Sequence, residues 1–133
     1  MSKGDLTKLK GKVKHFFHLG AVYDLEASAE TMHEANIVGT QTALAFAEAV
    51  NAGCFHLVSS IAAAGLYRGT FTEDMFEEAE ELDHPYHSTK HDSEGMVRAN
   101  GRIPYRIYRP GAVVGHSKTG FIDKIDGPYY FFK

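Results

Sequence analysis

The chain has 133 residues, 44% hydrophobic and 23% charged, which is typical of one globular domain and not of a disordered or fibrous protein. Its formal net charge is -3 and its acidic residues gather between positions 73 and 81, which argues against the clustered positive face of a nucleic-acid-binding protein. The single cysteine, Cys54, excludes an intrachain disulfide, and no stretch approaches the roughly 20 apolar residues of a membrane helix. The start lacks the apolar core of a signal peptide, so we expect a soluble, cytoplasmic protein.

Two elements are predicted in the first half of the chain. Residues 15–19 form a short, aromatic-rich run followed by Gly20, which predicts a buried strand ending in a turn. From about Ser28 to Val50 apolar residues recur at helical spacing, and the pattern closes at Gly53. We therefore expect a strand followed by one long helix.

The second half repeats this order. The apolar run 55–60 predicts a second strand, and residues 67–85, which lack a clear period, predict a loop with room for one short helix. A helix is expected over 86–99, ended by Gly101, and a third strand over 103–108.

Alternating strands and helices with short joints are typical of right-handed crossover units and a parallel sheet with helices on both faces. The predicted class is α/β, a doubly wound, Rossmann-like sheet, and residues 1–133 form one domain. In such sheets ligands bind beyond the carboxyl ends of the strands. The chemistry should therefore lie in residues 18–21, 59–62 and 109–113.

Tyr86 and Lys90 are four residues apart, which places both on one face of the predicted helix. The positive charge of Lys90 would favour the phenolate form of Tyr86, so the tyrosine could pass a proton near neutral pH. Hydride transfer to a carbonyl needs that proton at the developing alkoxide, and Ser60 could hold the same oxygen. The pair alone is weak evidence; the order in which these residues and the Arg-Pro-Gly of positions 109–111 follow one another is much more specific.

Five motifs occur in order along the chain. They are His18-Leu19-Gly20-Ala21, Asn36 with Gly39-Thr40, Val58-Ser59-Ser60, Tyr86 to Lys90, and Tyr-Arg-Pro-Gly-Ala-Val-Val-Gly at 108–115. In this order they resemble the extended short-chain dehydrogenases/reductases, most closely the thioester-reductase and fatty-acyl reductase-like branch. The resemblance runs from about residue 10 to the end.

The resemblance implies an oxidoreductase that transfers hydride from NAD(P)H, with NADP(H) favoured over NAD(H), to a carbonyl such as an acyl thioester or aldehyde. Tyr86 would exchange the proton, Lys90 would bind the nicotinamide ribose, Ser60 would position the carbonyl, and Asn36 would support the site from behind. The implied cofactor contacts are His18, Leu19, Gly20, Ala21, Val58, Ser59, Tyr86, Lys90, Pro110, Gly111 and Val113.

The sequence departs from the family pattern in three ways. Gly20 replaces the first alanine of His-Leu-Ala-Ala, and Ala62 stands where some members carry a second hydroxyl. No G-x-G-x-x-G occurs, although the resemblance places the glycine-rich turn that binds pyrophosphate well before His18. We therefore expect an incomplete domain that lacks its first βαβ half, with Phe16 and Phe17 on an open edge that favours association with a second copy.

Other functions stay open. A sugar-nucleotide epimerase or dehydratase and a hydroxysteroid dehydrogenase share the Tyr-x-x-x-Lys pattern, and a catalytically inactive fragment or interaction module is a third possibility. A metal site at His84, His87 and His91 is disfavoured because Pro85 follows the first of them, so no metal is expected. Cys54 is expected to be a buried structural thiol.

Overall fold

A three-stranded parallel sheet, in the order β1-β2-β3, lies at the centre of the computed structural model, which describes residues 3–22, 27–122 and 129. Helices fill both crossovers between the strands, as the sequence predicted, and one further helix precedes the sheet. The elements in chain order are α1 (Lys3–Leu9), β1 (Phe16–His18), α2 (Ala29–Met32), the π-helical η1 (His33–Val38), α3 (Gly39–Ala49), β2 (Phe55–Val58), the 3₁₀ turn η2 (Ile61–Ala64), α4 (Pro85–Asn100) and β3 (Tyr105–Tyr108).

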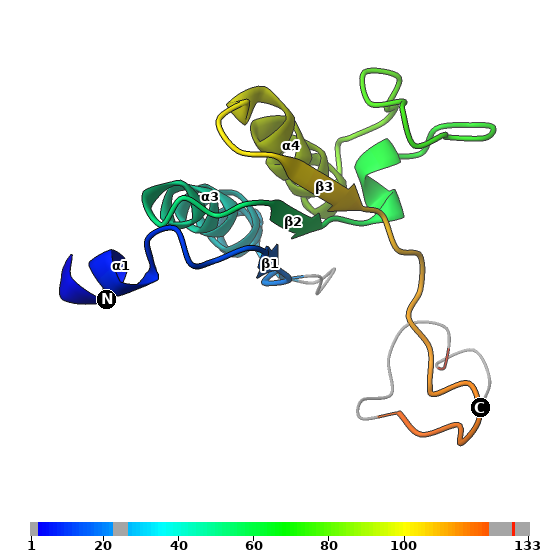
Figure 1. The fold of residues 1–133 in the computed structure, drawn as a ribbon. Helices are drawn as coiled ribbons and strands as arrows, with labels where there is room; N and C mark the ends of the chain where they lie inside the picture. The colour runs from blue at the N-terminus through cyan, green and yellow to red at the C-terminus, as the bar shows by residue number, and fades with distance from the viewer. Residues whose placement is uncertain (1–2, 23–26, 123–128, 130–133) are drawn as a thin grey trace.

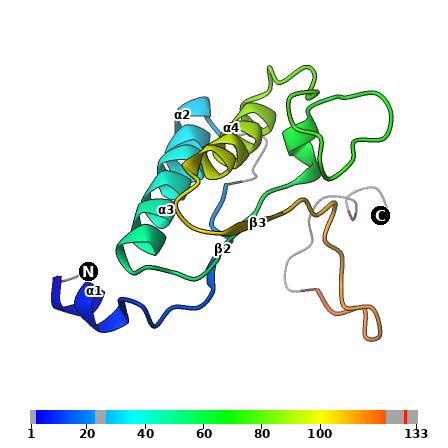
Figure 2. The same cartoon turned by 45° about the horizontal axis from the view of Figure 1, so that its top comes forward.

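Both crossover helices cover the same face of the sheet, as Figures 1 and 2 show. The sequence predicted helices on both faces of the sheet, but in the described residues the helices cover only one face. The reason is topological. Two right-handed crossovers that step in the same direction across a sheet must place their helices on the same side. Covering the other face requires a crossover in the opposite direction, which is not seen among residues 3–22 and 27–122.

The core lies between this helical layer and the sheet. Phe55 and Leu57 of β2 point into it and are 0% and 2% exposed, and Ala47, Val50 and Val97 pack against them from the helices. Because side chains alternate along a strand, the residues between these point to the other face. That face carries the rings of three residues in a row across the sheet, namely Phe17, His56 and Tyr108.

Residues 29–49 are helical throughout, which confirms the predicted long helix, but the middle of the helix is wound more loosely than expected. The Ser28 hydroxyl accepts a hydrogen bond from the Thr31 amide and caps the start. The six residues of η1 then form a π-helical stretch, which includes the buried Asn36. Such stretches are rare and are often found at functional sites.

The helix α4 begins and ends at residues that suit those positions. Pro85 occupies the first turn, where a missing amide hydrogen costs nothing, and the His84 ring accepts a hydrogen bond from the Tyr86 amide at 3.1 Å. Gly101 ends the helix with a φ of 61°. The side chains of Lys90 and Glu94 are directed into the protein and are 6% and 0% exposed.

The long stretch between η2 and α4 is a loop, as predicted, and the short helical turn lies before it at η2 rather than within it. A bridge between Gly65 and Glu80 closes this loop against η2. Gly65 has a φ of 65°, and an added Cβ would lie 1.8 Å from the Glu80 carbonyl oxygen, so only glycine fits there.

The helix α1 was not predicted, because its sequence is mainly polar and too short to show a period. Leu6 and Leu9 nevertheless pack against the core. Strand β1 has one neighbour among the described strands, and Phe17 on it is 57% exposed. Association through this edge remains a prediction. No helix in the described part of the chain is long and apolar enough to cross a lipid bilayer.

Candidate active site

The three strands end at the same edge of the sheet, at the arrowheads of Figure 1, and many of the predicted site residues belong to these ends or to the segments that follow them. His18 ends β1, Val58 ends β2 and Tyr108 ends β3. The segments that follow β2 and β3 stay in contact, because the Ser59 amide donates to the Tyr108 carbonyl at 2.8 Å and the Ile61 amide donates to the Pro110 carbonyl at 3.2 Å. The carboxyl edge is therefore a defined surface on which residues distant in sequence meet.

Lys90 reaches this edge from α4. Its side chain is buried, and its Nζ donates to the carbonyl oxygen of Val58 at 3.5 Å, a long hydrogen bond that leaves further donor capacity on the ammonium. Burial lowers the pKa of Lys90 from its usual value. The pKa of His18 is lowered too, first by burial and then by the positive charge of Lys90.

Tyr86 lies one turn before Lys90, in the first turn of α4, and is half-buried. The four-residue spacing puts the two side chains on the same face of the helix, as predicted. In the part of the chain that the structure describes, no hydrogen bond joins the Tyr86 hydroxyl directly to Lys90 or Ser60. The assembly of Tyr86, Lys90 and Ser60 into one site stays a prediction; in enzymes without bound substrate, catalytic hydrogen bonds are often long or not yet formed.

Ser60 follows β2 in an extended conformation and caps η2. Its Oγ accepts a hydrogen bond from the Ala62 amide at 3.1 Å, so the oxygen is held in place while the hydroxyl hydrogen stays available to donate. The neighbouring Ser59 is 4% exposed, and its Oγ has no hydrogen-bond partner among the residues that the structure describes. A buried hydroxyl without a partner is uncommon in proteins and needs an explanation.

Asn36 ties three segments together behind this edge. Its Oδ1 accepts from the Val22 amide at 2.8 Å, and its Nδ2 donates to the Val22 carbonyl at 3.0 Å and to the Thr89 hydroxyl at 3.0 Å. Thr89 immediately precedes Lys90 on α4. Asn36 therefore acts on the position of α4 and of the segment after β1, in agreement with a supporting role.

The segment after β1 is held by the same network. The His18 Nε2 and the Thr40 hydroxyl are 3.0 Å apart, and that hydroxyl donates to the Asn36 carbonyl at 2.6 Å. A Cβ on Gly20 would meet the His18 ring at 3.5 Å, an ordinary contact, so the departure from alanine changes little. Leu19 is 65% exposed, and Ala21 is half-buried.

The segment after β3 is brought to the edge only in part. Pro110 is half-buried, and a Cβ on Gly111 would lie 3.8 Å from the Ile61 side chain. Val113, another predicted cofactor contact, is 81% exposed, and the chain leaves the sheet at this point (Figure 1). Val113 is therefore not enclosed by the described residues.

The sequence analysis missed Glu94, which anchors the Arg-Pro-Gly segment. This carboxylate is 0% exposed and accepts from Arg109 at 2.5 and 3.1 Å and from Arg98 at 3.0 Å. Burial alone raises the pKa of Glu94, but hydrogen bonds and charge from Arg109 and Arg98 outweigh it and hold the pKa below its usual value. Its position four residues after Lys90 on the same helix face could have indicated this role.

The three histidines around the start of α4 have separate roles. His84 caps the helix, whereas the Nδ1 of His91 lies 3.0 Å from the Ala63 carbonyl and its ring stacks on Phe76 at 4.2 Å. They do not converge on one point. Two surface hollows of the described chain, one beside Glu30 and Glu34 and the other beside Phe76 and Arg98, are not lined by a predicted site residue.

Comparison with known proteins adds an independent line of evidence. Residues 1–133 match the NAD-binding family described as "Male sterility protein". The aldehyde reductase lnaA of Aspergillus flavus is 35% identical over 116 residues, which are 78% of this chain and 11% of that protein.

Among solved structures, the terminal R domain from the myxalamid PKS-NRPS biosynthetic pathway has a TM-score of 0.74 at 30% identity, over 90% of this chain and 32% of that domain. UDP-glucuronic acid 4-epimerase from Bacillus cereus, in complex with NAD, has a TM-score of 0.68 at 27% identity, over 84% of this chain and 36% of the epimerase. The chain thus spans about a third of these solved structures and about a tenth of the curated relative.

Proposed function

Because the chain belongs to the Male sterility protein family of NAD-binding domains, the thioester-reductase-like branch of the extended short-chain dehydrogenases/reductases, we propose that it carries the catalytic part of a reductase. The reaction is transfer of a hydride from NAD(P)H, with NADPH preferred, to the carbonyl carbon of an aldehyde or acyl thioester. The parent fold is a doubly wound sheet of which residues 1–133 contribute the described three strands.

The observation that carries this proposal is the placement of a buried ammonium at the end of the central strand. Lys90 Nζ lies 3.5 Å from the carbonyl oxygen of Val58, and Val58 is two residues before Ser60. On α4, Lys90 itself lies one helical turn after Tyr86. Burying a charged amine costs free energy, and burial lowers its pKa. An ammonium held at the carboxyl edge, on the helix that carries the Tyr86 phenol and at the end of the strand that Ser60 follows, suits proton transfer to a carbonyl oxygen.

The residues at this edge fit the nicotinamide-ribose end of the cofactor. Lys90 keeps donor capacity for ribose hydroxyls, and the unpartnered Ser59 hydroxyl offers a further polar group beside it. The glycine-rich turn that would hold the pyrophosphate does not occur in the 133 residues. Binding by this chain would therefore depend on contacts at one end of the cofactor.

The side chains divide the chemistry between them. Bound nicotinamide supplies the hydride to the carbonyl carbon. Tyr86 donates its hydroxyl proton to the carbonyl oxygen, and the ammonium of Lys90 stabilises the phenolate that remains. Ser60, held by the Ala62 amide, donates its hydroxyl hydrogen to the same oxygen and stabilises the developing charge. An aldehyde becomes an alcohol, whereas a thioester loses its thiol and becomes an aldehyde.

A second candidate is a sugar-nucleotide epimerase, dehydratase or related hydroxysteroid dehydrogenase. The likeness to the Bacillus cereus epimerase supports this second candidate, because the Tyr-x-x-x-Lys arrangement can serve both chemistries. The candidates differ in substrate, which is an acyl or aldehyde group for the first, a nucleotide sugar for an epimerase or dehydratase, and a steroid for a hydroxysteroid dehydrogenase. Catalytic inactivity, with the chain acting only through association, is the third candidate.

The test is a titration of the 133-residue chain with NADPH and NADH, followed by nucleotide fluorescence, and then turnover assays with a long-chain aldehyde, an acyl thioester and a UDP-sugar. We expect saturable binding that is tighter for NADPH, and NADPH oxidation with an aldehyde or thioester. Tyr86→Phe should lower the turnover rate at least about 100-fold and weaken nucleotide binding far less, since it removes the proton donor but only one of the implied cofactor contacts.

Tyr67→Phe is the matched control, because Tyr67 lies in the loop after η2 against Phe71 and should keep full activity. If the chain converts the UDP-sugar but neither the aldehyde nor the thioester, the proposed reaction is wrong and the second candidate is supported. Absence of nucleotide binding at millimolar concentration would refute the proposal for this chain and leave the third candidate.

A further inference from the structure

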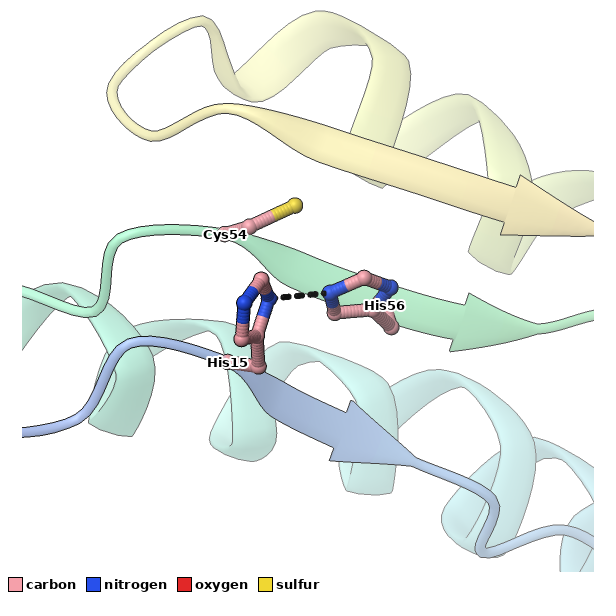
Figure 3. A group of neighbouring side chains, drawn as sticks. All are labelled: His15, Cys54 and His56. Carbon is pink, nitrogen blue, oxygen red and sulfur yellow. Dashed lines mark hydrogen bonds between the residues drawn. The ribbon is translucent and has the colours of Figure 1, made fainter.

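Three potential metal ligands converge at the opposite end of the sheet from the candidate active site. His15 immediately precedes β1, Cys54 immediately precedes β2, and His56 is the second residue of β2. Cys54 and His56 are two positions apart, so both point to the face that the helices leave uncovered. Figure 3 shows His15 reaching the same region from the neighbouring strand, and the ligand atoms of all three lie within 4.8 Å of one another.

The geometry is close to that of a bound ion. His15 Nδ1 and His56 Nε2 are 3.0 Å apart. Two nitrogens on one tetrahedral Zn²⁺ would be about 3.4 Å apart, given Zn–N distances of about 2.0 to 2.1 Å. His15 is exposed and Cys54 is half-buried, so small rotations of their side chains can bring all three atoms to one centre.

His56 is prepared for ligation by its surroundings. Its Nδ1 lies 2.9 Å from the Tyr108 hydroxyl, and a hydrogen bond donated there leaves the Nε2 lone pair directed at His15. Metal-binding histidines almost always have such a partner on the other ring nitrogen. The ring is also held in place by stacking on Phe17, with ring centroids 4.2 Å apart.

We propose that His15, Cys54 and His56 bind one Zn²⁺ ion through two imidazole nitrogens and a thiolate, with water as the fourth ligand. A thiolate with two imidazoles is a ligand set that suits Zn²⁺ and excludes the hard cations Mg²⁺ and Ca²⁺. The ion joins the start of β1 to the start of β2 and has a structural role. The proposal departs from the expectation of no metal, because His15 is 41 residues away from His56 in the sequence and meets it only through strand pairing.

The experiment is titration of the 133-residue chain with ZnCl2 by calorimetry and with CoCl2 by absorption spectroscopy. We expect one equivalent of Zn²⁺ to bind with a dissociation constant of about 1 µM or tighter, and Co²⁺ to give a thiolate charge-transfer band. His15→Ala should weaken Zn²⁺ binding at least tenfold, and Cys54→Ser should abolish the band. Tyr108→Phe should weaken binding by about tenfold through loss of the His56 partner.

His33→Ala is the control, since His33 is exposed on η1 away from the cluster, and its affinity should equal that of the unchanged chain. Circular dichroism without metal establishes that each variant is folded, which is expected because His15 and Cys54 are at least partly accessible. The proposal is overturned if the unchanged chain binds Zn²⁺ no more tightly than the His15→Ala variant, or if the cobalt band persists in Cys54→Ser.

Discussion

Replacing Glu94 by glutamine tests whether the buried carboxylate holds the end of β3 in place. The change keeps the size of the side chain and one acceptor oxygen, but it removes the negative charge. Arg109, whose side chain is 13% exposed, would then keep its guanidinium charge with no carboxylate beside it. Arg98, 28% exposed, has better access to water and should suffer less.

The size of the effect follows from burial. Removing one partner of a buried ion pair typically costs about 3 to 5 kcal/mol, because the other charge stays buried and uncompensated. Arg109 also donates to the carbonyls of Thr72 at 3.2 Å and Met75 at 2.7 Å, which partly compensates its charge and places the expected loss near the lower figure. A loss of about 3 kcal/mol lowers the Tm of a domain of this size by roughly 10 °C.

The assay is urea unfolding at pH 7 followed by circular dichroism, with Glu48→Gln as the matched control. Glu48 pairs with Arg102 at 2.9 Å, but the Arg102 side chain is 75% exposed, so its ion pair should contribute less than about 1 kcal/mol. Equal losses in free energy of unfolding for the two variants would refute the argument that burial, rather than pairing as such, makes Glu94 important.

Three further outcomes follow from the structure. The pKa of Glu94 is lowered in the folded chain, so the stability that its charge contributes is complete above the usual value of 4.5 and is lost as the pH falls below it. When the free energy of unfolding is measured at decreasing pH, it should therefore decline less in Glu94→Gln than in the unchanged chain. Gly65→Ala should lower the free energy of unfolding by about 3 kcal/mol in the same urea assay, because an added Cβ meets the Glu80 carbonyl. Gly101→Ala should lower it by about 1 kcal/mol, because Gly101 has a similar φ but open space around it. Asn36→Ala should cost about 2 kcal/mol by urea unfolding, and an unchanged midpoint would contradict its role in tying α4 to the segment after β1.

The order of strands and helices could be predicted from the sequence because each element carries its own local signal. The apolar run of β2 and the Gly101 terminus of α4 are examples, and the structure confirms both. The short helix α1 carried no such signal, since only its contacts with the core stabilise it. Coverage of a single face by α3 and α4 is a property of topology, which a list of elements leaves undetermined.

The candidate site was predictable where spacing along one element decides proximity. Tyr86 and Lys90 lie on the same helix face because they are four residues apart, and Lys90 is directed to the end of β2. Partners that meet only through folding were not predictable in this way. Glu94 with Arg109, and His15 with His56, are joined by contacts across 15 and 41 residues.

The π-helical stretch η1 also sets the rotational phase of the helix that contains it. Met32, Asn36, Thr40 and Leu44 are all buried and follow one another at intervals of four residues. In a regular α-helix, at about 100° per residue, twelve residues would turn the last of them roughly 120° away from the first. The wider π turns advance by a smaller angle per residue, so the four side chains stay in one line facing the protein interior. Removing one residue within η1 would leave Leu44 eleven residues after Met32, an interval that a regular α-helix turns to within roughly 20° of full alignment. Such a deletion is therefore expected to convert η1 into ordinary α-helix while Thr40 and Leu44 still face β1 and the core, whereas the same deletion in α3 would rotate the residues beyond it.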